Sequence, residues 1–302
     1  MRVRTRLTAA AATAMLSLTM AACGAAEPAA EAGACPNGKV RFGVEPYEDP
    51  AKLTPAYEVL AKALESKLGC PVELKIVDDY SAEVLAMRNG RLELAQFGPL
   101  GYVFASSKAN AQAVASFADG TGKLTTYTGG IWVPADSPIK SINDLVGKTL
   151  ALSSPGSTSG DALPRYALKK AGIADDAVKI DYAGGHPEAL LALKNAKVDA
   201  AEINSQQLAT ATAAGTFDKS KFRQVWTSEP IPNDPITMRG DLDKAFQDKV
   251  RKALLELSPS DVAKVSAFLD VDPPGPLVAV TKETYQPLFD LASALGLSED
   301  DV

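Results

Sequence analysis

The sequence is poor in the residues on which most catalytic and metal sites depend. Its 302 residues include one histidine, three cysteines and two tryptophans. It contains no Cys-X-X-Cys pair and no cluster of cysteine with histidine, which excludes the common zinc sites. It also lacks the nucleophile turn of serine hydrolases and the grouped carboxylates of metal-assisted phosphoryl transfer. We therefore expect a protein that is not an enzyme and that needs no metal and no cofactor.

The sequence also lacks an excess of positive charge, because its formal net charge is -6 at pH 7. Arg2, Arg4 and Arg6 are the only charged residues among the first 22, and without them 28 basic and 37 acidic residues give -9. Nucleic-acid binding requires clustered Lys and Arg, so we expect no nucleic-acid partner. Any bound anion must be held by local donors, since the field of the whole protein repels it.

The first 22 residues have the layout of a secretory signal. An arginine-rich start is followed by an apolar stretch from Leu7 to Met20 and by two alanines before Cys23. The stretch is too short and too rich in alanine for a membrane span, which needs about 20 strongly apolar residues. Cys23 after small residues resembles the lipobox of bacterial lipoproteins, although Met20 stands where leucine is usual. This predicts a lipid anchor on Cys23 at the outer face of the cytoplasmic membrane, with residues 23–37 as a flexible tether. An ordinary secreted protein is the alternative.

The other two cysteines, Cys35 and Cys70, then remain in an oxidising compartment. Two thiols outside the cytoplasm suggest a disulfide. It would tie the segment before the first expected strand to the loop before the second. Two free thiols are the alternative.

Strand-like and helix-like segments alternate from residue 38 onward. In the first cycle we expect strands at 39–45, 71–77 and 92–97. The helices between them are expected to start at Thr54 as N-cap, to cover 81–88, and to follow Gly98-Pro99. This order predicts an α/β fold with mostly parallel sheets.

A second cycle follows Gly129-Gly130. Its expected helices cover 158–171, 186–197 and 205–213, and its expected strands cover 131–135, 148–152, 178–183, 198–203, 222–226 and 235–240. The last 60 residues are expected to be mostly helical, with a helix capped by Asp241.

Two such cycles predict two lobes, with the chain crossing between them near 124–131 and 230–237. We place lobe 1 at 38–128 and 235–302, and lobe 2 at 129–234. A single large sheet is the alternative.

Ser157, Thr158 and Ser159 lie between an expected strand and an expected helix, within SSPGSTSG (153–160). The first N–H groups of a helix have no intrahelical partner, and the helix dipole adds about half a positive charge there. Three hydroxyls add donors, and the flanking glycines allow the backbone to approach closely. The stretch therefore predicts a cradle for a tetrahedral anion that is built without formal charge. A simple helix cap is the alternative.

Two tyrosines and the single histidine follow strands in a similar way. Tyr47 follows the first expected strand, Tyr102 lies in a strand-to-helix turn, and His186 starts a helix after Gly-Gly. Open α/β sheets bind ligands beyond the carboxyl ends of their strands, so we expect all three side chains at the same cleft as the serines. His186 would donate a ring N–H to an anion. Packing tyrosines and a solvent-exposed histidine are the alternatives.

Asp234 lies in the second expected crossing, within IPNDPITM (231–238). A phosphonate, phosphite or phosphate can carry a P–OH proton near neutral pH, which a carboxylate accepts in a charge-assisted hydrogen bond. Sulfate lacks this proton, so Asp234 is expected to reject it. The alternatives are a carboxylate that meets the ammonium of an aminophosphonate, and a turn-forming Asn-Asp pair.

Six segments together resemble the substrate-binding proteins of ABC importers for phosphate, phosphite and phosphonate. The likeness extends from about residue 38 to 255, with the segments in the order of the family. The STSG run and the downstream Gly-Gly-His are specific, whereas the DSPI…DLVGKT stretch is shared with other importer-associated binding proteins. The segments are FGVEPY (42–47), MRNGRLELAQFGPLGYVFA (87–105), DSPIKSINDLVGKTLAL (136–152), SPGSTSG (154–160), GGHPEALLALKNAKVDAA (184–201) and EPIPNDPITMRGDL (229–242).

The resemblance implies a type II periplasmic-binding fold, with two lobes that close over a ligand. Each lobe is expected to be a mostly parallel sheet flanked by helices. It implies that Ser157, Thr158 and Ser159 hold the phosphorus oxygens. The other expected members of the binding shell are His186, Tyr47, Tyr102 and Asp234. An ABC permease is the implied partner, and we expect a monomer.

The resemblance leaves the ligand open among phosphonate, phosphite and phosphate. Family members that take aminoalkylphosphonates have an additional acid on the second lobe, where this chain has Asn204-Ser205-Gln206-Gln207, although Glu202 lies just before. This departure favours a small ligand without an amine. The alternatives are the same fold binding a sulfonate or a thiamine precursor, and a sensor component.

Overall fold

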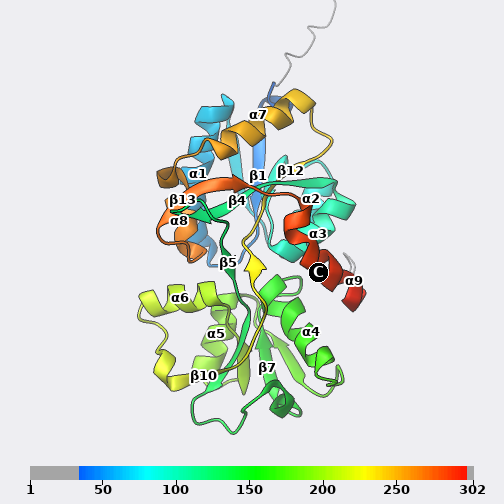
Figure 1. Ribbon diagram of the computed structural model, residues 1–302, viewed down its shortest axis with the longest axis vertical. Helices are drawn as coiled ribbons and strands as arrows, with labels where there is room; N and C mark the ends of the chain where they lie inside the picture. Colours follow the sequence, from blue (N-terminus) through cyan, green and yellow to red (C-terminus); the bar gives the residue numbers. More distant parts are fainter. Residues whose placement is uncertain (1–33, 298–302) are drawn as a thin grey trace, which may run out of the picture. The chain divides into compact units, whose positions relative to one another are not determined.

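The computed structural model describes residues 34–297, so the expected signal, Cys23 and residues 24–33 of the expected tether lie outside the described residues. The described chain forms two main sheets, each with apolar packing against helices on both faces (Figure 1). The first sheet has six strands in the order β13-β4-β12-β3-β1-β2. These strands are β1 (Val40–Val44), β2 (Val72–Ile76), β3 (Leu94–Gln96), β4 (Ala111–Asp119), β12 (Ile236–Arg239) and β13 (Pro274–Ala279).

The second sheet has five strands in the order β10-β6-β9-β7-β8. They are β6 (Gly130–Pro134), β7 (Thr149–Leu152), β8 (Lys179–Tyr182), β9 (Ala200–Glu202) and β10 (Phe222–Thr227). The chain passes from the first sheet to the second between β4 and β6, and returns between β10 and β12. The two connecting segments contain β5 (Thr126–Tyr127) and β11 (Ile231–Pro232), which pair antiparallel in a short ribbon between the sheets (Figure 1).

Most strands of each sheet run in one direction, as expected, but both sheets are mixed because a few strands run against the others. In the first sheet, β1 to β4 run in one direction, but β12 is inserted antiparallel between β3 and β4. In the second sheet, β7, β8 and β9 are parallel, while β6 pairs antiparallel with both β9 and β10. The physical reason is the crossing, because β12 and β6 each enter their sheet from the other one and so run against its parallel strands.

Helices of two groups cover the first sheet. Apolar residues of α1 (Pro50–Leu68), α7 (Lys244–Leu255) and α8 (Pro259–Phe268) share one buried cluster with strand residues. A second cluster contains residues of α2 (Tyr80–Arg88), α3 (Pro99–Lys108) and α9 (Gln286–Leu295). Around the second sheet lie α4 (Leu163–Lys170), α5 (His186–Lys194) and α6 (Ser205–Ala213) (Figure 1). Short turns of helix occur at Pro36–Gly38, Ile142–Leu145, Thr158–Ala162, Lys219–Lys221 and Lys282–Tyr285.

Two expected helix starts are wrong. The first helix begins at Pro50 with Asp49 as N-cap, not at Thr54, because Asp49-Pro50 offers the same pair of cap and first-turn proline one turn earlier. This earlier start places Leu53 on the buried face, where it is fully covered. Likewise α7 is capped by Asp243, whose side chain accepts the N–H of Phe246, while Asp241 pairs with Arg239.

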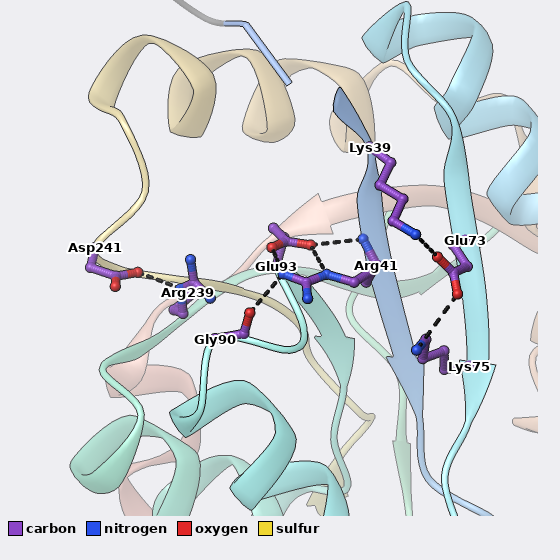
Figure 2. Close-up of polar contacts among 8 residues, drawn as sticks. All are labelled: Lys39, Arg41, Glu73, Lys75, Gly90, Glu93, Arg239 and Asp241. Atoms are coloured by element: carbon purple, nitrogen blue, oxygen red, sulfur yellow. Dashed lines mark hydrogen bonds and ion pairs between the residues drawn. The ribbon is translucent and has the colours of Figure 1, made fainter. Parts of the chain in front are cut away.

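Charged pairs fix the strand that leads to the candidate site. Arg41 on β1 donates to both carboxylate oxygens of the fully buried Glu93, which precedes β3 (Figure 2). Glu93 also accepts the backbone N–H of Arg41 at 2.9 Å, so the pair joins β1 to the segment beside it. At the other edge, Glu73 on β2 lies between Lys39 and Lys75 at 2.6 and 3.6 Å (Figure 2). These three residues are largely exposed, and such pairs contribute about 0–1 kcal/mol.

A disulfide joins Cys35 and Cys70, as the cysteine count suggests, with 6.3 Å between the two Cα atoms. It fixes the start of the described chain to the turn between α1 and β2. Within residues 34–297, no helix combines the length and the apolar character that crossing a membrane requires.

Candidate ligand-binding site

A small cavity lies between the loops and helices beside the two sheets and the ribbon. Its volume is about 30 Å³, against the roughly 10–15 Å³ that one water needs on the same measure, so only a ligand of a few heavy atoms fits. Hydroxyls, phenols, amides and carboxylates make up most of the lining. The lining residues are Glu45, Tyr47, Glu48, Tyr80, Gly98, Tyr127, Ser157, Thr158, Ser159, His186, Asn204, Gln206, Gln207, Thr210, Asp234 and Phe268.

Ser157, Thr158 and Ser159 form one wall of this cavity and are each at most 2 % exposed. Ser157 is the N-cap of the turn that leads into α4, and its Oγ accepts the N–H of Gly160 at 3.1 Å. A side chain at Gly160 is sterically excluded, because its Cβ would lie 1.8 Å from the Ser153 Oγ. The first N–H groups of such a turn have no intrahelical acceptor.

Each of the three hydroxyls already accepts a hydrogen bond from the protein. Thr158 Oγ1 accepts the N–H of Leu100 at 2.9 Å, and Ser159 Oγ accepts from Asn204 Nδ2 at 3.2 Å. A hydroxyl has one proton to donate, and in each of these three an oxygen lone pair already accepts a hydrogen bond from the protein. The three protons are thus available to an acceptor in the cavity, and such an arrangement suits an anion.

Asp161, 1 % exposed, holds this wall in place from behind. Its carboxylate accepts from the Gly156 N–H at 3.1 Å, from Arg165 Nε at 2.6 Å and from the Tyr182 hydroxyl at 2.7 Å. Because Asp161 is satisfied by these donors, its charge does not need a partner in the cavity.

His186 is the cationic group of the site. It is the first residue of α5 and is 4 % exposed. Its Nε2 lies 3.2 Å from Ser157 Oγ, and its Nδ1 lies 2.8 Å from the fully buried Glu202 carboxylate. Burial alone would lower the pKa of His186, but Glu202, together with Glu48 and Asp234, raises the pKa above its ordinary value. The imidazolium form then has an Nε2–H that points toward the serine wall.

Asp234 reaches the cavity from the segment between β11 and β12 and is 5 % exposed. Ser116 Oγ fixes its backbone by donating to the Asp234 carbonyl at 2.9 Å, and its Oδ2 accepts a hydrogen bond from Gln96 Nε2 at 3.4 Å. Burial raises the pKa of Asp234 to about 7, against the lowering effects of Gln96 and His186. The carboxylate therefore changes charge near neutral pH.

Four tyrosines lie at or beside the cavity. The Tyr47 hydroxyl is 2.9 Å from that of Tyr57, which lies behind it on α1. Tyr80 interacts with the hydroxyl of Ser157. Tyr127 interacts with the hydroxyls of Thr158 and Ser159. Burial raises the pKa of all four phenols well above the ordinary value, so they are neutral and can donate.

Tyr102 does not reach this cavity, so its predicted place in the site is wrong. Its ring packs edge-on against Tyr285 and Phe289, with ring centres 5.3 and 5.9 Å apart, in the cluster under α9. The reason is its register in α3, which begins at Pro99, because Tyr102 lies almost one turn into the helix. The backbone N–H of Leu100, in the first turn, makes the contact to Thr158 instead.

The structure brings six of the seven predicted residues to one cavity, namely Tyr47, Ser157, Thr158, Ser159, His186 and Asp234. Sequence reasoning missed Glu45, Tyr80, Tyr127 and Asn204. Glu45 had an available signal, because it follows β1 directly and strand ends line such clefts. Tyr80 is the first residue of α2, and Tyr127 belongs to the ribbon, whose pairing the sequence does not announce.

Comparison with known proteins places these features in context. The family model described as "ABC transporter, phosphonate, periplasmic substrate-binding protein" matches residues 42–285. The phosphonates-binding periplasmic protein of Escherichia coli is 30% identical over 216 residues, which are 70% of this chain and 64% of that protein. The match thus spans less than two thirds of the E. coli protein.

Two further proteins are similar to this chain. The phosphate-import protein PhnD of Mycolicibacterium smegmatis is 27% identical over 263 residues, which cover 83% of this chain and 82% of that protein. The solved structure of PhnD1 from Prochlorococcus marinus in complex with methylphosphonate has a TM-score of 0.76 at 18% identity. It covers 86% of this chain and 99% of its own. The latter likeness establishes a common fold, the two-lobed type II periplasmic-binding fold.

Proposed function

Since the chain belongs to the family of periplasmic phosphonate substrate-binding proteins of ABC transporters, we propose that it captures a small phosphorus oxyanion. The ligand is a phosphonate, phosphite or phosphate, and an ABC permease receives it. One observation carries this proposal: three buried hydroxyls, each accepting a hydrogen bond from the protein behind it, line a cavity of about 30 Å³ beside His186.

Binding is proposed to combine donors from the second lobe with a selective carboxylate near the first. Ser157, Thr158, Ser159 and His186 hold the phosphorus oxygens, and the neutral phenol of Tyr47 faces them. Asp234 accepts the remaining P–OH proton, which a phosphorus monoanion has and sulfate lacks.

Closure of two lobes over the ligand is the proposed mechanism, with lobe 1 at 38–128 and 235–302 and lobe 2 at 129–234. Two hydrogen bonds link these parts in the described structure, that from the Leu100 N–H to Thr158 Oγ1 and that from Gln206 Nε2 to the Leu269 carbonyl at 3.3 Å. The paired strands β5 and β11 supply the hinge. The protein acts as a monomer in this proposal.

The proposed location is the outer face of the cytoplasmic membrane, with a lipid on Cys23 and the residues up to 34 as a tether. The expected tether of 23–37 is shortened because Cys35 is joined to Cys70 and Pro36–Gly38 forms a turn of helix. The anchor keeps the protein near its permease. Replacing Cys23 with serine should release the protein into the soluble extracytoplasmic fraction, and a lipid label should mark only the parent. A variant that stays membrane-bound and labelled would contradict the anchor.

Isothermal titration calorimetry of the chain from residue 24 onward tests the ligand class. We expect heat with at least one of phosphite, methylphosphonate, aminoethylphosphonate and phosphate, and none with sulfate. Heat with sulfate or an alkanesulfonate alone would overturn the proposal.

A further inference from the structure

We propose that Glu45 is a specificity-determining residue of this site: its carboxylic acid keeps its proton in the cavity wall and uses it to donate a hydrogen bond to the bound oxyanion. The inference rests on the proposed function, because it assigns a role toward the same ligand. It adds a donor from the first lobe to the hydroxyls of the second.

The position of Glu45 is the first argument. It directly follows β1, is 3 % exposed and lines the cavity together with Ser157, Thr158 and Ser159. Its carboxyl group accepts the backbone N–H of Gly98, the N-cap of α3. The other oxygen, Oε2, is buried and has no hydrogen-bond partner within the described protein. Buried polar atoms are rarely left unpartnered, so this oxygen is expected to find its partner in the cavity.

The second argument is the surroundings, which disfavour a charge on Glu45. Burial raises the pKa of Glu45 well above its ordinary value, and the negative charge of Asp234 raises it further. Glu83 is fully buried on α2, both of its carboxyl oxygens lack a hydrogen-bond partner among residues 34–297, and it interacts with Glu45 and Asp234. Buried carboxyls so close to one another cannot all ionise.

The groups that face Glu45 come from several elements, and among the described residues no Lys or Arg lines the cavity beside it. Lys52 is paired with a different acid, because its Nζ lies 3.2 Å from Glu48 Oε1. His186, which is paired with Glu202, lowers the pKa of Asp234 but does not figure among the influences on Glu45. The remaining facing groups are Asp234, Glu83 and the phenols of Tyr47, Tyr57, Tyr80 and Tyr127.

A bound anion further favours the protonated form of Glu45. A second negative charge beside Glu45 makes its ionised form still less favourable, whereas the neutral acid donates a hydrogen bond to that charge. Glu45 and Asp234 then have complementary roles: Glu45 donates a hydrogen bond to one ligand oxygen, and Asp234 accepts a hydrogen bond from the P–OH group of another. A buried carboxylic acid held neutral in order to donate is an established device in apolar enzyme sites.

Two substitutions distinguish a hydrogen-bond donor at Glu45 from a charged residue, from a residue that only holds α3, and from one that only packs. In Glu45→Gln an amide N–H replaces the acid proton and the amide oxygen can still accept from Gly98, so methylphosphonate affinity should stay within about threefold of the parent. In Glu45→Met the shape is similar but the donor is absent, so affinity should fall by about tenfold or more. Glu73→Gln, on the edge strand β2 beside Lys39 and Lys75 (Figure 2) and outside the cavity lining, is the matched control and should leave affinity unchanged.

Calorimetric titration with methylphosphonate at neutral pH is the measurement, on variants whose thermal unfolding is still cooperative. Tighter binding by both Glu45 variants would mean that the parent residue is charged, and equal affinity in all three proteins would mean that it serves only α3. Equal losses in both variants would point to packing. Each of these results overturns the inference. If the parent itself binds no phosphorus oxyanion, the proposed function fails instead.

An infrared difference spectrum of the parent needs no destabilising variant. Adding methylphosphonate should shift the carbonyl band of a protonated carboxylic acid, and this band should be missing from the spectrum of Glu45→Gln. The same band in both proteins, or none in the parent, would contradict the proton on Glu45.

Discussion

Replacing Asp234 with asparagine is expected to make sulfate a ligand and to remove the pH dependence of its rejection. The parent carboxylate is 5 % exposed, and burial raises its pKa to about 7. Because the folded pKa is raised, the side chain is neutral at lower pH and becomes charged as the pH rises through about 7. Sulfate should therefore bind the parent weakly at about pH 5 and not measurably at about pH 9.

The size of the effect follows from the burial. Two unit charges about 4 Å apart near a protein surface repel by about 4 kcal/mol at an effective dielectric constant of about 20, a factor of about a thousand in affinity. Asparagine removes this repulsion and can donate an N–H to a sulfate oxygen. For a phosphorus monoanion, the same change loses one charge-assisted hydrogen bond, about 1.5–3 kcal/mol or roughly tenfold to a hundredfold.

Titration calorimetry with sulfate and with methylphosphonate, for parent and variant at about pH 5 and about pH 9, measures both effects. The expected result is sulfate binding by Asp234→Asn at both pH values. Equal rejection of sulfate by the variant and the parent at the higher pH would refute the assigned role of Asp234.

Three further predictions concern the serine wall, the histidine pair and the disulfide. Thr158→Val removes a hydroxyl without changing the shape, so methylphosphonate affinity measured by calorimetry should fall about tenfold to a hundredfold, and an unchanged affinity would exclude this donor. Glu202→Gln removes the carboxylate that raises the pKa of His186, so the ring should be neutral and methylphosphonate affinity should fall at about pH 7.5. At about pH 5.5 the ring should regain its charge and the variant its affinity. Parallel pH profiles of affinity in parent and variant would refute the pairing. Replacing Cys35 and Cys70 with serine opens a loop with a sequence separation of 35 and should lower the free energy of unfolding by about 4 kcal/mol in denaturant titrations, which a loss below about 1 kcal/mol would contradict.

Much of the fold was predictable because runs of β-branched and apolar residues indicate most of the strands. The strands β4 and β13 were not predicted, and both belong to the first sheet. Residues Ala111–Asp119 of β4 are rich in alanine, which has low strand propensity, so burial between β12 and β13 decides their conformation. β13 lies in a region expected to be helical, and it pairs with β4 far away in the sequence.

The site was predictable where residues follow a strand or open a helix. Ser157, His186 and Asp234 occupy such positions, and strand ends meet at one edge. Tyr102 satisfied the same rule but lies almost one turn into α3, and a shift of a few residues in a helix turns a side chain away. Asn204 and Glu202 were named only as a departure from the family, and their contacts with the serine wall and with His186 became visible in the structure.

The central claim is that neutral hydroxyls and amides at the start of the second lobe's helix hold a tetrahedral anion in an acidic protein. A crystal structure of the protein with methylphosphonate tests it most directly. The account predicts the phosphonate oxygens within hydrogen-bond distance of the hydroxyls of Ser157, Thr158 and Ser159, with His186 beside them. A phosphonate bound elsewhere, or these hydroxyls turned away from it, would contradict the account.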